Sequence, residues 1–180
     1  MTLKYPLEPL YDRDLSEVSH FSKGVVVFDR DGTLIEDAGQ HNDVKQVKFI
    51  SATISVMGLL NSQNFGIAVA SNQAGLESEK FSLLELQNFN SEMNRQIKST
   101  IGSEIHLIAV CPHLSASNCD CRKPKPGLLK AINESGLGQV RLFVGNSDSD
   151  REAAEQYCID YMDVNSKDFS TRMADWASKL

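Results

Sequence analysis

Residues Gly24 to Leu34 read GVVVFDRDGTL, and this stretch decides the fold. The run from Val25 to Phe28 is apolar and mostly β-branched, which is typical of a strand buried on both faces of a parallel sheet. Asp29 and Asp31 follow directly, and the two-residue period of an extended chain should point both carboxylates one way and Arg30 elsewhere. Because Asp-x-Asp-Gly is also common turn chemistry, this stretch alone leaves two interpretations, a turn or a site.

The totals indicate one acidic domain. The chain has 180 residues and a formal net charge of -6, which argues against nucleic-acid or anionic-membrane binding. Residues 1–22 show no periodicity and are expected to form an N-terminal arm, and residues 23–180 the domain. No apolar run approaches the roughly 20 residues that span a bilayer, and the N-terminus lacks a signal-peptide core. We therefore expect a cytoplasmic protein and a monomer.

Strand and helix patterns alternate along the rest of the chain. Further strands are predicted at 66–70, 105–110, 141–145 and 159–164, and helices at 52–63, 127–133, 151–158 and 168–180. A capping box of Ser82 and Glu85 starts one more helix. His106, within an apolar strand, is expected to be a hydrogen-bonded structural residue. This alternation predicts an α/β protein with a doubly wound, Rossmann-like parallel sheet in three α/β/α layers, and the connections leave no room for a cap domain.

Polar residues follow four of the predicted strands. They are Asp29 and Asp31, then Ser71 and Asn72, then Arg122 and Lys123, and finally the segment from Asn146 to Asp150. The carboxyl ends of parallel strands share one edge of a sheet, so these residues should converge, which turn chemistry does not explain. In this order they resemble the four motifs of the haloacid-dehalogenase-like hydrolases, over about residues 24–165.

The resemblance implies a phosphatase that works through an aspartyl-phosphate. Asp29 would be the nucleophile, and Asp31 would protonate the leaving alcohol and later deprotonate water. Lys123 would hold the phosphoryl oxygens and steady Asp29. The substrate would be bound by Ser71, Asn72 and Arg122.

The resemblance also implies Mg²⁺, held by Asp29, Asp31, Asn146 and Asp150. Many relatives have Gly-Asp where this chain has Gly145-Asn146, and an Asn ligand supplies no negative charge. That departure leaves open a catalytically weak, phosphate-binding protein. A phospho-accepting receiver domain would share the sheet and the strand-end Asp, but it would explain neither Asp31 nor the cysteines described next.

Three of the four cysteines form a compact set with one histidine: Cys111, His113, Cys119 and Cys121. A Cys3His set matches a closed, structural, tetrahedral zinc site, and a disulfide framework does not fit this spacing. The alternative is a cluster of reduced thiols without a metal. Because Cys121 directly precedes Arg122 and Lys123, zinc would fix both cations over the site.

The pattern CPH…CDCRKP resembles the small zinc-containing branch, subfamily IIIA, that includes heptose 1,7-bisphosphate and histidinol-phosphate phosphatases. The segment from Lys123 to Gly127 is similar to the heptose enzymes. The five-residue spacer in the cysteine set and the segment from Asn72 to Leu76 are similar to the histidinol-phosphate enzymes, and Gln40-His41 departs from the heptose pattern. Our first expectation is D-glycero-D-manno-heptose 1,7-bisphosphate 7-phosphatase, in carbohydrate metabolism, with histidinol-phosphate phosphatase second.

Overall fold

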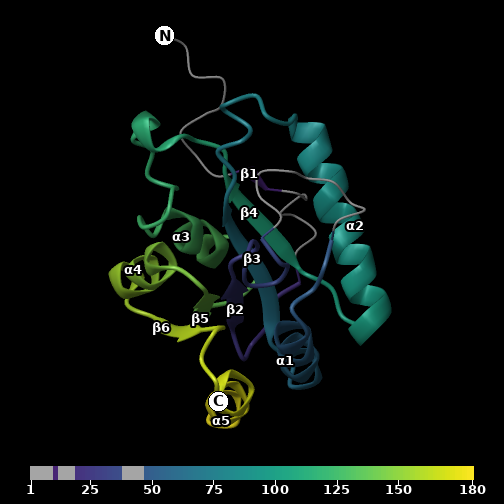
Figure 1. Ribbon diagram of the computed structural model, residues 1–180. Helices are drawn as coiled ribbons and strands as arrows, with labels where there is room; N and C mark the ends of the chain where they lie inside the picture. The colour runs from purple at the N-terminus through teal and green to yellow at the C-terminus, as the bar shows by residue number, and fades with distance from the viewer. Residues whose placement is uncertain (1–9, 12–18, 38–46) are drawn as a thin grey trace.

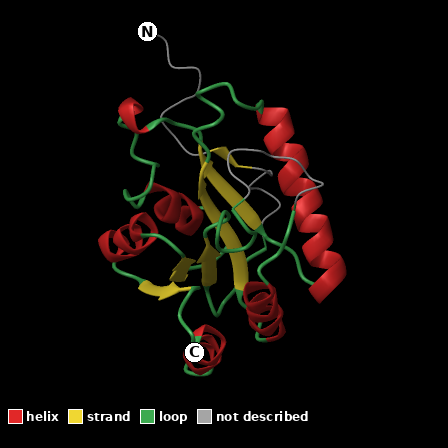
Figure 2. Cartoon of the chain, viewed as in Figure 1, coloured by secondary structure: helices red, strands yellow, loops and turns green. Residues whose placement is uncertain are grey.

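The computed structural model describes residues 10–11, 19–37 and 47–180. Their strands form one sheet in the order β1-β4-β3-β2-β5-β6, with helices on both faces (Figures 1 and 2). β2 to β6 are parallel, and β1 pairs antiparallel with β4 at the edge. The predicted doubly wound α/β sheet is confirmed, with an edge strand that the sequence did not indicate. The strands are β1 (Leu10–Tyr11), β2 (Val25–Phe28), β3 (Gly66–Asn72), β4 (Leu107–Cys111), β5 (Val140–Gly145) and β6 (Asp160–Asp163).

β2 is a central strand, hydrogen-bonded to β3 on one side and β5 on the other. All four of its residues are completely buried. Val26 and Phe28 join the apolar core on one face of the sheet, and Val25 and Val27 join the core on the other. This two-sided burial explains the unbroken apolar run, and it delivers Asp29 to the middle of the carboxyl edge.

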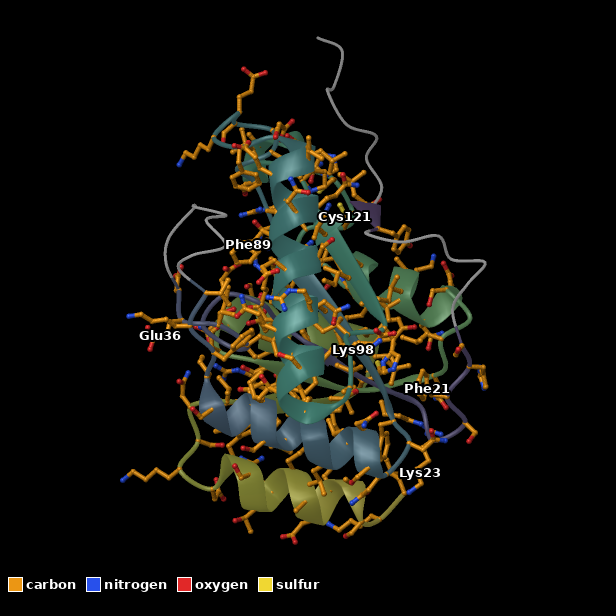
Figure 3. All side chains as sticks on the ribbon, turned by 90° about the vertical axis from the view of Figure 1, so that its right-hand side faces the viewer. Phe21, Lys23, Glu36, Phe89, Lys98 and Cys121 are labelled. Atoms are coloured by element: carbon orange, nitrogen blue, oxygen red, sulfur yellow. The ribbon has the colours of Figure 1, made fainter. Side chains whose placement is uncertain are left out.

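One face of the sheet is covered by α1 (Ser51–Ser62), α2 (Leu83–Ile101) and α5 (Phe169–Ala177). In Figure 3, α2 stands upright across this face, and α1 and α5 lie side by side beneath it. The predicted capping box starts α2: the Glu85 N–H donates to Ser82 Oγ over 3.2 Å, and the Ser82 N–H donates to Glu85 Oε2 over 2.7 Å.

The other face is covered by α3 (Gly127–Glu134) and α4 (Asp148–Tyr157), on the left of the sheet in Figure 1. α4 begins three residues before the predicted start at 151. The reason is a second capping box: the Asp150 N–H donates to Ser147 Oγ over 3.3 Å, and the Ser147 N–H donates to Asp150 Oδ2 over 3.1 Å. Asp150 therefore lies in the first turn of a helix rather than in a loop.

Only part of the expected N-terminal arm lies within the described residues. Leu10 pairs with Val110 in β4. The Phe21 N–H donates to the Leu137 carbonyl over 2.8 Å, and the Phe21 ring packs 4.4 Å from that of His106. His106 Nδ1 accepts from the Ile67 N–H over 3.0 Å, which confirms its structural role.

Apart from the elements above and the 3-10 turn Ser115–Ser117 (η3), the described residues form no further helix or named strand that could make a cap domain. Within the same part of the chain, no helix is both long and apolar enough to cross a membrane. The segment Gln40-His41 lies outside the described residues.

Candidate active site

Lys123 joins three of the predicted strand ends. Its Nζ lies 2.5 Å from Asp29 Oδ1, 2.7 Å from Asp150 Oδ1 and 2.9 Å from the carbonyl oxygen of Ala70. Asp29 follows β2, Asp150 lies in the first turn of α4 after β5, and Ala70 belongs to β3. Lys123 itself comes from the loop after β4. Lys123 and Asp29 are 94 positions apart in the sequence, and they meet, together with Asp150, at the carboxyl edge of the sheet.

The charges at this point are almost fully removed from water. Asp29 is 7% exposed, and its burial raises the pKa of its carboxyl from 3.8 to about 6, with Lys123 pulling it down and Asp150 pushing it up. Burial opposes the charge of Lys123, but the Asp29 and Asp150 carboxylates outweigh that effect and raise its pKa above the ordinary value. The ammonium also lies 5.3 Å from the centre of the Phe143 ring. Lys123 is thus a permanent buried cation beside a carboxylate that is costly to ionise.

Asp150 has two differently used oxygens. Oδ2 accepts from the Asn146 N–H over 3.2 Å and from the Ser147 hydroxyl over 2.7 Å, besides the capping bond. Oδ1 is buried and ion-paired with Lys123, but no donor within the described part of the chain is aligned with it as a hydrogen bond. The Asn146 side chain packs against Gly32, where a Cβ would lie 2.1 Å from Asn146 Nδ2 and where φ is +77°. Asn146 therefore borders the turn that carries Asp31, where only glycine leaves room for it.

Asp31 is held by two neighbours. Arg30 forms a two-bond fork with it, from Nε to Oδ2 over 3.0 Å and from Nη2 to Oδ1 over 3.1 Å. Gln73 Nε2 donates to Oδ2 over 2.9 Å. The expectation that Arg30 points elsewhere is wrong for its guanidinium, because the long side chain folds back. Gln73 is absent from the predicted site, although its place in the polar segment after β3 was a usable signal.

Ser71 and Asn72, at the end of β3, have separate partners. Ser71 is 1% exposed, and its Oγ accepts from Gln73 Nε2 over 2.7 Å. Asn72 makes a reciprocal pair with the backbone of Lys123: Nδ2 donates to the carbonyl oxygen, and the Lys123 N–H donates to Oδ1, each over 3.1 Å. The amide of Asn72 thus fixes the loop that carries the lysine, and substrate binding by Asn72 stays a prediction.

A cavity of about 250 Å³ opens beside Asp31 and is also lined by Arg30, Asn72, Gln73, Phe81 and Arg122. Arg122 Nη1 donates to the carbonyl oxygen of His113 over 2.9 Å, so the cysteine loop anchors this cation. A larger cavity of about 520 Å³ is lined by Val140, the first residue of β5, and therefore lies at the opposite, amino edge. Of these two cavities, the smaller one adjoins Asp31 at the carboxyl edge.

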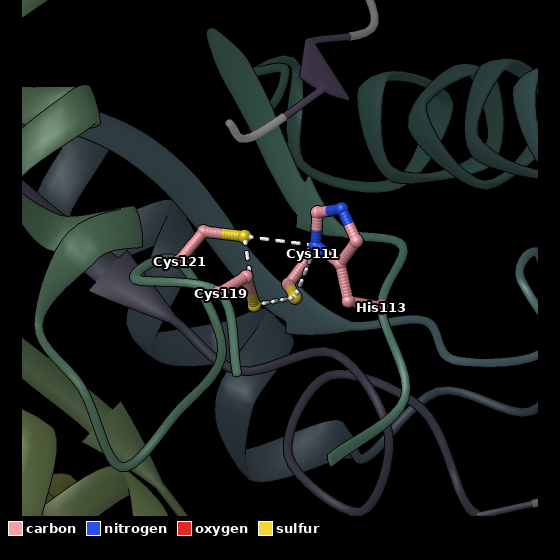
Figure 4. A group of neighbouring side chains, drawn as sticks. All are labelled: Cys111, His113, Cys119 and Cys121. Atoms are coloured by element: carbon pink, nitrogen blue, oxygen red, sulfur yellow. Dashed lines mark hydrogen bonds between the residues drawn. The ribbon is translucent and has the colours of Figure 1, made fainter. Parts of the chain in front are cut away.

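The predicted cysteine and histidine set comes together (Figure 4). The ligand atoms of Cys111, His113, Cys119 and Cys121 all lie within 4.8 Å of one another, and all four residues are buried. His113 Nδ1 lies 3.4 Å from Cys111 Sγ and 3.3 Å from Cys121 Sγ. Hydrogen bonding to Cys121 and His113 outweighs burial and lowers the pKa of Cys111 to about 5. Four soft donors, one of them a ready thiolate, fit a tetrahedral metal ion.

The cysteine loop is tied to the loop after β3. Glu77 Oε2 accepts from the Leu114 N–H and, over 2.6 Å, from the Ser117 hydroxyl, and these bonds lower the pKa of Glu77. A Cβ at Gly127 would lie 2.2 Å from the carbonyl oxygen of Asp120, so the start of α3 packs directly on the loop backbone. The loop is therefore held from both sides.

Two known proteins illustrate what this chain is similar to in sequence. A D-glycero-beta-D-manno-heptose-1,7-bisphosphate 7-phosphatase of Pseudomonas aeruginosa is 34% identical over 140 residues, which is 74% of this chain and 76% of that protein. The histidine biosynthesis bifunctional protein HisB of Legionella pneumophila is 29% identical over 147 residues, 79% of this chain but 42% of that protein.

A solved structure shares the fold of this chain, and a family model identifies its family. The D,D-heptose 1,7-bisphosphate phosphatase of B. bronchiseptica, complexed with magnesium and phosphate, covers 87% of this chain and 99% of its own, with a TM-score of 0.72 and 20% identity, so it shows the shared fold. The family model described as polynucleotide kinase 3 phosphatase matches residues 24–180. The chain therefore belongs to the polynucleotide kinase 3 phosphatase family of haloacid-dehalogenase-like phosphatases.

Proposed function

We propose that the protein is a magnesium-dependent phosphomonoesterase and that it hydrolyses the 7-phosphate of D-glycero-D-manno-heptose 1,7-bisphosphate. The observation that carries the reaction class is the buried Lys123, in contact with both Asp29 and Asp150 at the carboxyl edge of the sheet. Similarity to the Pseudomonas heptose bisphosphate phosphatase supports the substrate.

In the proposed reaction, an Asp29 oxygen forms a bond to phosphorus while the ester P–O bond breaks, and Asp31 gives its proton to the leaving alkoxide. Asp31 then takes a proton from water, which attacks the aspartyl-phosphate and releases inorganic phosphate. Because Ser71 Oγ accepts from Gln73, its own proton remains for a phosphoryl oxygen. Lys123 and Arg122 supply positive charge for the phosphate oxygens.

The charges of the site support Mg²⁺. The Asp29 and Asp150 carboxylates outnumber the one ammonium of Lys123, so the buried group is negative and repels a phosphate dianion. Asp29, the Asp31 carbonyl, Asn146 and Asp150 would hold the metal, and Asp150 Oδ1 lacks an aligned hydrogen-bond donor. When bound, Mg²⁺ supplies the positive charge that lets the phosphate approach Asp29.

We further propose that Cys111, His113, Cys119 and Cys121 hold a structural zinc ion. All four donors are buried and face one another, which leaves no open position for a substrate. Three related expectations stay proposals. The negative net charge favours a small metabolite over a polynucleotide. The four free thiols fit the cytoplasm. The large apolar side chains exposed among the described residues, on Leu84, Leu114 and Leu180, are scattered, which fits a monomer.

A phosphate-release panel with Mg²⁺ tests the proposal. The panel holds the heptose 1,7-bisphosphate, histidinol phosphate and an oligonucleotide with a 3′-phosphate. We expect the highest kcat/KM with the heptose bisphosphate, one phosphate released per molecule, and no turnover by Asp29→Asn. A preference for histidinol phosphate would reassign the substrate, as the similarity to the Legionella protein would allow. No release from any of the three compounds would refute the proposed reaction.

A further inference from the structure

The Asp31 carboxylate accepts three hydrogen bonds from the residues that the structure describes, and its two oxygens share them unevenly. Oδ2 accepts from Arg30 Nε and Gln73 Nε2, whereas Oδ1 accepts, within this part of the chain, only from Arg30 Nη2. A carboxylate oxygen has two in-plane lone pairs. Oδ2 is therefore fully occupied and Oδ1 keeps one acceptor position, while the side chain is still 27% exposed beside the cavity.

The two donors are themselves fixed. The Arg30 guanidinium lies 4.8 Å from the centre of the ring of Phe89, a residue of α2 that is labelled in Figure 3, and Arg30 is 3% exposed. Gln73 is 5% exposed, its backbone N–H donates to the Cys111 carbonyl oxygen over 2.7 Å, and its Nε2 also donates to Ser71 Oγ over 2.7 Å. Turning away from Asp31 would cost Arg30 its contact with Phe89 and Gln73 its side-chain bond to Ser71.

Stability alone does not account for Arg30. Its Nη1 is buried without a hydrogen-bond partner among the described residues, and an unpaired buried donor costs about 1–3 kcal/mol. An apolar residue against Phe89 would avoid that cost, and because the Asp31 side chain is 27% exposed, water could solvate its carboxylate in place of the fork. The contribution of Arg30 is therefore the position in which its two hydrogen bonds hold the Asp31 carboxylate.

We propose that Arg30 and Gln73 are positioning residues that aim Asp31 for proton transfer, and that Oδ1 is the oxygen that gives and takes the proton. The proposal rests on the proposed phosphatase reaction. Neither residue has to touch the substrate for this role. The fork fixes the plane of the carboxylate, and Gln73 keeps Oδ2 occupied, so the proton is exchanged on the side of Oδ1.

The role predicts a dependence on the leaving group. An alkoxide is a strong base and must be protonated as it leaves, whereas p-nitrophenolate is a weak base and leaves without an acid. In Gln73→Met, which keeps the length of the side chain and loses the donor, we expect kcat/KM for an alkyl phosphate such as the heptose bisphosphate to fall about tenfold to a hundredfold. We expect kcat/KM for p-nitrophenyl phosphate to change little, because it reports only the steps up to the aspartyl-phosphate; the later water step needs Asp31 with both substrates and can lower kcat for both.

Arg30→Lys gives a second test, because lysine keeps the charge and cannot form the fork. Arg30→Lys should likewise lose kcat/KM with the alkyl phosphate and keep it with p-nitrophenyl phosphate. Matched controls lie on α2, where Arg95 forms a two-bond fork with Glu92 and Gln96 donates to the same carboxylate, away from the site. Arg95→Lys and Gln96→Met should leave both substrates unaffected.

The outcomes separate the two proposals. Equal loss of kcat/KM on both phosphates in Gln73→Met and Arg30→Lys, or no loss on either, would overturn the positioning role while leaving the phosphatase assignment intact. Absence of turnover of both phosphates by the unmodified protein would refute the phosphatase assignment, and the positioning role with it. Circular dichroism and zinc content should match those of the unmodified protein in every variant used.

Discussion

Replacing the proposed nucleophile should stabilise the protein while it abolishes turnover. Burial raises the pKa of Asp29 from 3.8 to about 6, so at neutral pH its carboxylate is harder to keep ionised in the folded chain than in the unfolded one, and folding is less favourable by that difference. The difference corresponds to about 3 kcal/mol. Asparagine resembles the protonated acid in shape and still offers Oδ1 to Lys123, which also keeps Asp150 and the Ala70 carbonyl as partners.

The direction in which the Asp29 carboxyl changes folding stability with pH follows from proton linkage. Between pH 3.8 and about 6 the folded protein keeps the Asp29 proton and the unfolded chain loses it, so this group lowers stability as pH rises through that window. The full cost is present above pH 6 and absent well below pH 4. Asp29→Asn should therefore gain up to about 3 kcal/mol at pH 7 to 8, or about 6–12 °C in Tm, and little at pH 4. Loss of one charge partner for Lys123 makes this an upper value.

Urea unfolding at several pH values, without added magnesium, measures the effect. Asp175→Asn, on the exposed side of α5, is the matched control and should change stability by less than about 0.5 kcal/mol. Added Mg²⁺ should reduce the gain, because only the carboxylate binds the metal well. A destabilised Asp29→Asn at pH 7, or a gain that is the same at pH 4 and pH 8, would refute the reasoning.

Two further substitutions test the metals. Cys119→Ser should lose zinc and lower Tm, whereas Cys158→Ser, which removes an exposed thiol outside the cluster, should keep both; equal zinc content in the two purified variants would contradict the zinc site. Asn146→Asp adds a charged ligand beside Gly32 and should lower the Mg²⁺ concentration for half-maximal phosphate release by roughly tenfold. An unchanged Mg²⁺ dependence would mean that Asn146 is not a ligand.

Local sequence patterns were sufficient for the central part of the fold. The apolar run Val25–Phe28 predicts a strand buried on both faces, and the two separate cores confirm it. The capping box of Ser82 and Glu85 predicts the start of α2, because both bonding partners lie within four residues of each other and the signal is local. The second capping box, Ser147 to Asp150, is an equally local signal. The helix predicted at 151–158 leaves it out, so its predicted start is three residues late.

The site was harder to predict because its contacts are long-range. The Asn72 amide is bonded to the Lys123 backbone across 51 residues, and no pattern within either segment indicates that pair. The fold-back of Arg30 onto Asp31 depends on Phe89, which α2 supplies from another part of the chain. The sequence could place polar residues at one edge of the sheet, but not say which of them would hold others in position.

The end of β3 connects the zinc cluster with both halves of the proposed chemistry. Asn72 is paired with Cys111 in the register of β3 and β4, and Asn72 holds the backbone of Lys123. The next residue, Gln73, is bonded through its N–H to the Cys111 carbonyl and through its side chain to Asp31. A shift of the cysteine loop would therefore displace two residues together: Lys123, beside the proposed nucleophile Asp29, and Gln73, the proposed positioning residue of Asp31. Zinc would thus influence turnover through the positions of Lys123 and Asp31, without any contact with the substrate.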